Sequence, residues 1–133
     1  MIENVYPSLM ENLLSGNFAD FTGVDYITCA LLDGTGEYDS ANSSWTDVSD
    51  SEIADADYSP VTLTNVTVTE DEGVVLLDCD TIDFGTEVTI TASNAVLYAD
   101  GNLIMHFDFE GEQSSENGNF QIEVPNGLID WSV

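Results

Sequence analysis

The chain contains no lysine and no arginine, whereas 26 of its 133 residues are aspartate or glutamate, so its formal net charge is −26. Without basic side chains the fold cannot contain a salt bridge to lysine or arginine, and it must rest on apolar burial and backbone hydrogen bonds. Like charges oppose the compact state, so salt, bound cations or a basic partner has to offset their repulsion. In molar salt the Debye length falls to about 3 Å, which removes most of the repulsion between the carboxylates.

The same charge excludes several classes of partner. Binding to nucleic acid needs lysine or arginine at the phosphates, and an anionic membrane surface repels such a chain. We therefore expect no nucleic-acid partner and no membrane partner. A basic protein surface, divalent cations or a high-salt medium is favoured instead. Composition leaves open whether the charge serves hydration in salty water or recognition of one basic partner.

Apolar residues make up 43% of the chain, close to the norm of about 45–50% for globular proteins. This content argues against disorder despite the charge. A chain of this length is normally one domain that can bury a core. We therefore expect residues 1–133 to form a single β-rich domain.

One helix is expected, at the N-terminus over about residues 2–15. Gly16 is a natural stop for it. Pro7 is acceptable only in a first helical turn, so the regular helix should begin close to it. The apolar side chains that recur at helical spacing are Val5, Tyr6, Leu9, Met10, Leu13 and Leu14.

The remaining sequence predicts β-strands. Residues 24–32 form an apolar run typical of a strand buried on both faces, and alternating apolar residues dominate after Pro60. Asp100 and Gly101 indicate a hairpin turn, and residues 111–119 predict a loop. About seven or eight strands with regular turn signals predict a mainly β fold, a small sandwich or barrel with one N-terminal helix.

Residues 37–58 are polar, acidic and rich in serine, and they predict a long loop with a short helix near 43–49. Loops of this length usually serve a function or carry some structure of their own. Trp45 in this loop and Trp131 in the last strand are candidate interface anchors, although core packing is the alternative for both. The residues expected at an interface are Trp45, Asp47, Tyr58 and Trp131.

Several short segments place carboxylates close together, and hard cations such as Ca²⁺ prefer oxygen ligands. None of these segments has the spacing of the helix–loop–helix calcium site, and a solvated acidic surface is the alternative interpretation. The candidate ligands are Asp33, Asp39, Asp78, Asp80 and Asp83. We expect no cofactor apart from Ca²⁺ or other cations at these acidic loops.

The sequence offers no sign of catalysis. No glycine-rich phosphate loop, nucleophile elbow or catalytic triad is visible, so we expect that the protein is not an enzyme. His106 is expected on the outer face of a strand and exposed, with no second ligand at metal-binding spacing. Cys29 lies in an apolar run that favours a buried free thiol, but whether it is bonded to Cys79 stays open.

Several short motifs follow one another in a fixed order along the chain. They are Tyr6, Leu9, Leu13, Leu14 and Gly16, the ALLD run at 30–33, Tyr38, Trp45, Asp47, the VLYAD run at 96–100, and Pro125, Asn126, Gly127 and Trp131. This order resembles a family of short structural proteins encoded by tailed bacterial and archaeal viruses. Its members have a similar first helix, then a strand of the "ALVD" kind, and later one of the "IVIYKD" kind.

This resemblance implies a virion component that is made in the host cytoplasm and has no catalytic residues. It favours a decoration (cement) protein on the capsid surface, in many copies or as a homo-oligomer, with the major capsid protein or other virion proteins as partners. A tail or head–tail component is the nearest variant. The chain departs from the family by having no Lys or Arg, which suggests a host in a saline or marine environment.

Two other classes of function remain as alternatives. The first is an acidic DNA mimic that inhibits a nucleic-acid-binding enzyme, for which the charge of −26 is the motivation. A mimic needs carboxylates spaced like phosphates, whereas here they gather in loops and strands. The second is a calcium-dependent carbohydrate-binding module, which calcium should stabilise against unfolding.

Overall fold

Two long antiparallel strands dominate the computed structural model, which describes residues 1–132. They are β7 (Val88–Ala99) and β8 (Asn102–Gly118), joined at Asp100 and Gly101. Both turn residues have positive φ, 50° and 77°, as a two-residue hairpin turn demands. The predicted hairpin is confirmed. The other elements are β1 (Ile2–Val5), α1 (Pro7–Leu14), β2 (Thr28–Leu32), β3 (Val61–Thr62), β4 (Thr67–Asp71), β5 (Val74–Asp78), β6 (Ile82–Asp83), β9 (Gln121–Ile122), β10 (Ile129–Ser132) and the 3-10 turns η1 (Trp45–Asp47) and η2 (Ser49–Ser51).

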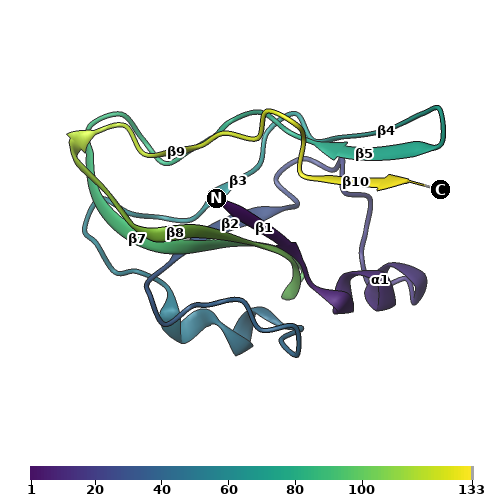
Figure 1. The fold of residues 1–133 in the computed structure, drawn as a ribbon, viewed down its shortest axis with the longest axis horizontal. Coiled ribbons are helices and arrows are strands. Elements are labelled where there is room, and N and C mark those ends of the chain that lie inside the picture. Colours follow the sequence, from purple (N-terminus) through teal and green to yellow (C-terminus); the bar gives the residue numbers. More distant parts are fainter. Residues whose placement is uncertain (133) are drawn as a thin grey trace.

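The strands form two layers (Figure 1). The larger layer is a five-stranded sheet with the order β1-β8-β7-β2-β3. Facing it lie a three-stranded sheet, β10-β5-β4, and the short β6-β9 pair. The predicted mainly β, sandwich-like fold with one helix near the N-terminus is therefore confirmed. Ten strands lie within residues 1–132, and three of them have only two residues.

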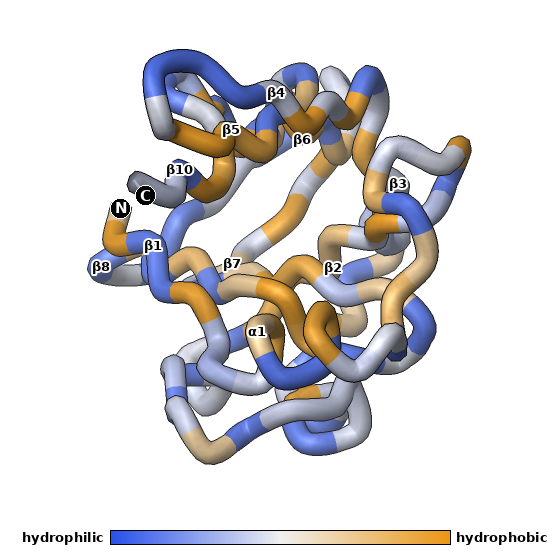
Figure 2. The backbone as a smooth tube through the Cα atoms, turned by 90° about the vertical axis from the view of Figure 1, so that its right-hand side faces the viewer, coloured by the Kyte–Doolittle hydropathy of each residue, from blue (hydrophilic) through white to orange (hydrophobic). Residues whose placement is uncertain are grey.

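The main core lies between the two layers. Alternate residues of β2 point to opposite faces of the sheet, so that Cys29 and Leu31 enter this core while Ala30 and Leu32 point outward. Leu9 of α1 packs into the same core. In Figure 2 the most hydrophobic stretches lie in strands and in α1, whereas the β4–β5 turn is strongly hydrophilic. The buried side chains that face each other across the layers include Leu97, Met105, Phe107, Leu77, Ile82, Ile122 and Ile129.

Residues 33–58, here called the 33–58 segment, cover the outer face of the five-stranded sheet, as Figure 1 shows below β7 and β8. Bridges join Leu32 to Glu52 and Ser44 to Asn102. A second apolar cluster forms under this segment, and it comprises Tyr6, Ala30, Leu32, Val48, Val96 and Leu103. The expected short helix near 43–49 is present as η1, followed by η2. β2 is consequently buried on both faces, as predicted.

The expected helix over residues 2–15 is wrong in its first third. Ile2–Val5 forms β1, which pairs antiparallel with residues 105–108 of β8. Tyr6 is extended, with φ −71° and ψ 132°, because the residue before a proline avoids the helical region. The helix begins at Pro7, where the missing N–H has no intrahelical partner to lose.

The predicted loop at 111–119 is also wrong, since β8 continues to Gly118. Its composition has little β propensity, but side chains tie it to β7. Ser115 Oγ donates to the carbonyl oxygen of Val88 at 2.7 Å, and the hydroxyls of Ser114 and Thr91 lie 2.9 Å apart. Tertiary pairing therefore overrides local preference in this half of β8.

Candidate interaction surface

Trp45 and Asp47 both hold the 33–58 segment in place. The Trp45 ring stacks on Tyr98 with centroids 4.5 Å apart, and its backbone N–H donates to the Gly101 carbonyl at 2.9 Å. The Asp47 carboxylate accepts from the backbone N–H groups of Ser43 and Ser44 at 2.9 and 3.0 Å. These bonds lower the pKa of Asp47. Trp45 remains half-buried, so part of its ring is accessible to a partner.

Tyr58 points into the protein. Its hydroxyl donates to Glu52 Oε2 at 2.6 Å and accepts from the backbone N–H of Leu31 at 3.2 Å. The ring stacks near Phe84, with centroids 6.2 Å apart. Burial is the largest cause that raises the pKa of this phenol. The contacts of Tyr58 are therefore internal, and they link the end of the 33–58 segment to β2.

Trp131 lies in the other layer of the fold. It belongs to β10, the last strand as predicted, which pairs with β5 and forms one edge of the three-stranded sheet. Its ring is half-buried against the main core. The structure thus brings Trp45 and Asp47 together but places Trp131 and Tyr58 elsewhere. The four residues do not form one surface.

The five candidate metal ligands are likewise not brought together. Asp33 accepts from Thr35 N, Asp39 from Ala41 N and Asp83 from Gly85 N, each at 2.8–2.9 Å. Asp78 accepts from Cys79 N at 2.8 Å, and Asp80 accepts from Asn65 Nδ2 at 2.6 Å. Each carboxylate therefore stabilises a local turn or loop. Within residues 1–132, no group of three or more His, Cys, Asp or Glu side chains could hold a metal ion.

His106 is fully buried, contrary to the exposed position expected from the sequence. Its side chain does point to the outer face of the five-stranded sheet, but the 33–58 segment covers that face. Nε2 lies 2.8 Å from the Gly36 carbonyl oxygen, and the rings of Tyr6 and Tyr38 pack around the imidazole. Burial lowers the pKa of His106, partly offset by the Gly36 contact and by the charge of Asp108.

The two cysteines are free thiols. Cys29 is fully buried, as the sequence predicts, and Cys79 is half-buried. Burial raises the pKa of both thiols, and Asp78 and Asp80 raise that of Cys79 further. A thiol is a poor nucleophile until it ionises, so neither cysteine is activated for chemistry.

The structure shows a groove that the sequence did not indicate. It has a volume of about 410 Å³ and lies between β8, β9 and the start of β1. We call it the β8–β9 groove. Near it, the N-terminal amino group of Met1 lies 2.7 Å from Glu110 Oε2, the one ion pair within residues 1–132. Because 111–119 lacks strand propensity, no sequence signal could reveal the groove. Its lining residues are Met1, Phe109, Gln113, Ser114, Asn119, Phe120, Gln121, Ile122 and Glu123.

The charge lies entirely outside the core. All 26 carboxylates fall within residues 1–132, and none of them belongs to the buried set, whose polar members are Asn94 and His106. Within the same residues, no helix has the length and apolarity needed to cross a membrane. Comparisons with protein-family models, curated proteins and solved structures found no match to this chain.

Proposed function

We propose that the protein is a virion structural protein, a decoration protein that binds the outer surface of a tailed-virus head in many copies. The observation that carries the proposal is the separation of charge from core. A two-layer apolar interior is complete, while the accessible surface carries acidic side chains and no lysine or arginine. The resemblance to short viral structural proteins supplies the class of assembly. The partner is then the major capsid protein or another virion protein.

This distribution of charge suits a particle coat. Copies with a charge of −26 repel one another and stay dispersed until they meet their assembly site. The same charge keeps them from binding the packaged genome, because phosphates repel carboxylates. At high ionic strength the repulsion is screened to a few ångströms, and neighbouring copies can then sit side by side on a shell.

The contacts of the acidic side chains also favour a structural role. Carboxylates such as Asp33, Asp47 and Asp83 accept backbone hydrogen bonds that shape loops in both layers. They rigidify the surface that a partner would meet. A DNA mimic would instead need them free and arranged in rows, so this arrangement supports the mimic less well.

Open strand edges offer a means of attachment. β1, β4 and β10 each end a sheet, and every residue of β4 is exposed. Ile2 and Val5 on β1 are 47% and 38% exposed. Exposed edges of this kind pair readily with a strand from another chain. We therefore place the attachment of the protein to its shell at strand edges.

Quantitative mass spectrometry of purified particles tests the proposal. We expect the protein in the head fraction, at a copy number comparable to that of the major capsid protein. Recovery in the tail fraction alone would replace the decoration role by the tail variant. Absence from intact particles, in an infection where the protein is made, would contradict a virion role altogether.

A further inference from the structure

We propose that the β8–β9 groove binds an extended, basic segment of a partner protein as an added β-strand. This deepens the proposed function by naming the surface and the chemistry of the partner, and it rests on that function only in making the partner a virion protein. Three features support it: unpaired backbone groups on two sides of the groove, an apolar floor, and a rim that attracts cations.

The β8 side of the groove presents free backbone groups. The N–H of Thr91 points away from β8 and donates to Asp55 Oδ2 at 2.8 Å. Thr91 is the register partner of Ser114, so these two residues form a pair without mutual backbone hydrogen bonds. The N–H and C=O of Ser114 must then point outward, away from β7. Ser114 lines the groove.

The β9 side shows the same feature. Phe120 N donates to the Gly85 carbonyl at 3.1 Å, and the Phe120 carbonyl accepts from Phe84 N at 2.9 Å. In an antiparallel ladder the direction of the backbone groups alternates along each strand. The N–H and C=O of Gln121 therefore point away from β6, and Gln121 also lines the groove. Two strand edges thus present unpaired groups to one space.

The free edge of β8 at the groove lies next to the part of β8 that β1 covers. β1 pairs with β8 only over Met105–Asp108, and Met1 already lines the groove. Beyond it, β8 pairs with β7 alone over its last residues. Glu110 N is occupied by Asp108 Oδ1 at 2.7 Å, whereas the backbone groups of Ser114, farther along β8, point outward. An added strand would occupy the place beside β8 that β1 leaves empty.

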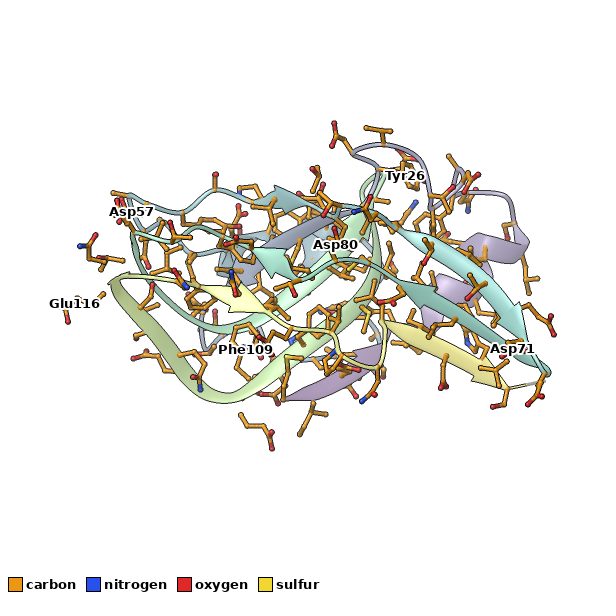
Figure 3. The ribbon with its side chains drawn as sticks, turned by 90° about the horizontal axis from the view of Figure 1, so that it is seen from above. Tyr26, Asp57, Asp71, Asp80, Phe109 and Glu116 are labelled. Atoms are coloured by element: carbon orange, nitrogen blue, oxygen red, sulfur yellow. The ribbon has the colours of Figure 1, made fainter. Side chains whose placement is uncertain are left out.

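The floor of the groove can seat apolar side chains. Phe109 and Phe120 lie with ring centroids 6.4 Å apart, and Ile122 lines the same groove. Figure 3 shows Phe109 in the space between the ribbons of β8 and β9. Successive side chains of a strand point to opposite faces. A bound strand would therefore place every second side chain on these rings and the others toward the rim.

The rim selects a basic occupant. Glu123 is exposed at the groove, and Glu110 already binds the N-terminal ammonium of Met1 nearby, which shows how a lysine ammonium would be held. A second copy of the chain is disfavoured, because it carries no lysine or arginine and brings another charge of −26. Charge complementarity thus points to a foreign segment in which Lys or Arg alternates with apolar residues.

A peptide titration tests the inference without reference to any particle. The probe is a capped six-residue peptide of alternating Lys and Val, added to the ¹⁵N-labelled protein at fixed ionic strength. We expect the largest amide shifts at Ser114, Gln121 and their neighbours. A peptide of alternating Lys and Pro has the same charge, but every second residue lacks the N–H needed for pairing along one of its two edges, and we expect it to bind much more weakly.

Two charge reversals complete the test. Glu123→Lys should weaken binding of the Lys-Val peptide at least about tenfold, whereas Glu37→Lys, an equal change on the exposed 33–58 segment, should not. Both residues are exposed. Amide spectra check that both variants keep the fold. Equal binding of the two peptides, equal effects of the two variants, or shifts spread over the whole surface would overturn the inference.

A particle-binding assay with the same variants separates this inference from the proposed function. If Glu123→Lys binds particles as well as the unaltered protein does, the groove is not the attachment site, while the decoration role stands. If the groove binds the peptide as described but neither protein binds particles, the decoration role falls, and the groove retains its specificity for basic strands.

Discussion

Nε2 of His106 lies 2.8 Å from the carbonyl oxygen of Gly36, a contact that joins the middle of β8 to the 33–58 segment. The imidazole is fully buried, and its Nδ1 has no hydrogen-bond partner. As a donor, Nε2 satisfies Gly36 in the neutral ring. A second proton on Nδ1 would leave a buried charge with one N–H unsatisfied.

The burial of His106 predicts a loss of stability in mild acid. The pKa of folded His106 is held below its ordinary value of 6.5, chiefly by burial. Below pH 6.5 His106 therefore binds a proton more readily in the unfolded chain than in the folded one. The contribution of His106 to stability is complete above pH 6.5 and declines as the pH falls toward the folded pKa. Thermal unfolding between pH 7.5 and 5.5 should show a falling melting temperature.

His106→Gln is the control for this effect, because its amide can still donate to Gly36 but does not titrate. The variant should show a clearly smaller change in melting temperature over the same range. Measurements in high salt suppress the contribution of the carboxylates. Identical pH profiles for the two proteins would show that His106 is not responsible.

Two tyrosines should respond in opposite ways to loss of the hydroxyl. The Tyr6 hydroxyl is buried without a partner, so Tyr6→Phe should leave stability unchanged or raise it by up to about 1 kcal/mol. Tyr58→Phe removes bonds to Glu52 and Leu31 and should cost about 1–3 kcal/mol. Urea unfolding measures both values, and a larger loss for Tyr6→Phe would contradict this account of the two sites.

Asp55 should contribute more to stability than its partly exposed position suggests. Its carboxylate accepts the Thr91 N–H on the side of β7 that faces away from β8. Asp55→Ala leaves that donor unpaired and should cost about 1 kcal/mol or more. Asp130→Ala removes the same charge from the exposed surface of β10 and should have a neutral or slightly stabilising effect. Equal changes in the free energy of unfolding for the two variants would mean that Asp55 affects stability only through its charge.

Salt should stabilise the fold through screening and not through a particular ion. Raising NaCl from 0.1 M to 1 M shortens the Debye length from about 10 Å to about 3 Å, so the melting temperature should rise. Since the candidate ligands Asp33, Asp39, Asp78, Asp80 and Asp83 each serve a separate turn or loop, CaCl₂ should do no more than NaCl of equal ionic strength. A saturable extra stabilisation by millimolar Ca²⁺ would indicate a specific site.

The parts of the fold that the sequence predicts are those with strong local patterns. Alternation in residues 88–99, the Asp100–Gly101 turn and the apolar run at Cys29 all specify strands or a turn by themselves. Pro7 likewise marks where α1 begins. The helix was extended wrongly to residues 2–5, because Val5 fits the helical spacing of the residues after it, and only pairing with the neighbouring edge of β8 makes this segment a strand.

The features that could not be predicted depend on contacts between distant segments. The alternation of residues in β8 correctly places His106 on the outer face of its sheet. Its burial, however, depends on Gly36, which lies 70 residues earlier in the chain. Ser114 and Ser115 have little β propensity and become a strand through bonds to Thr91 and Val88. The β8–β9 groove depends on that same strand, so it was equally hidden from sequence reasoning.

A cryo-EM reconstruction of the virus particle tests the central claim most directly. We predict that the two-layer fold fits density on the outside of the head at many symmetry-related positions, with the β8–β9 groove against a basic, extended segment of another virion protein. A map in which every protein density of head and tail is assigned and this fold is absent would contradict the account.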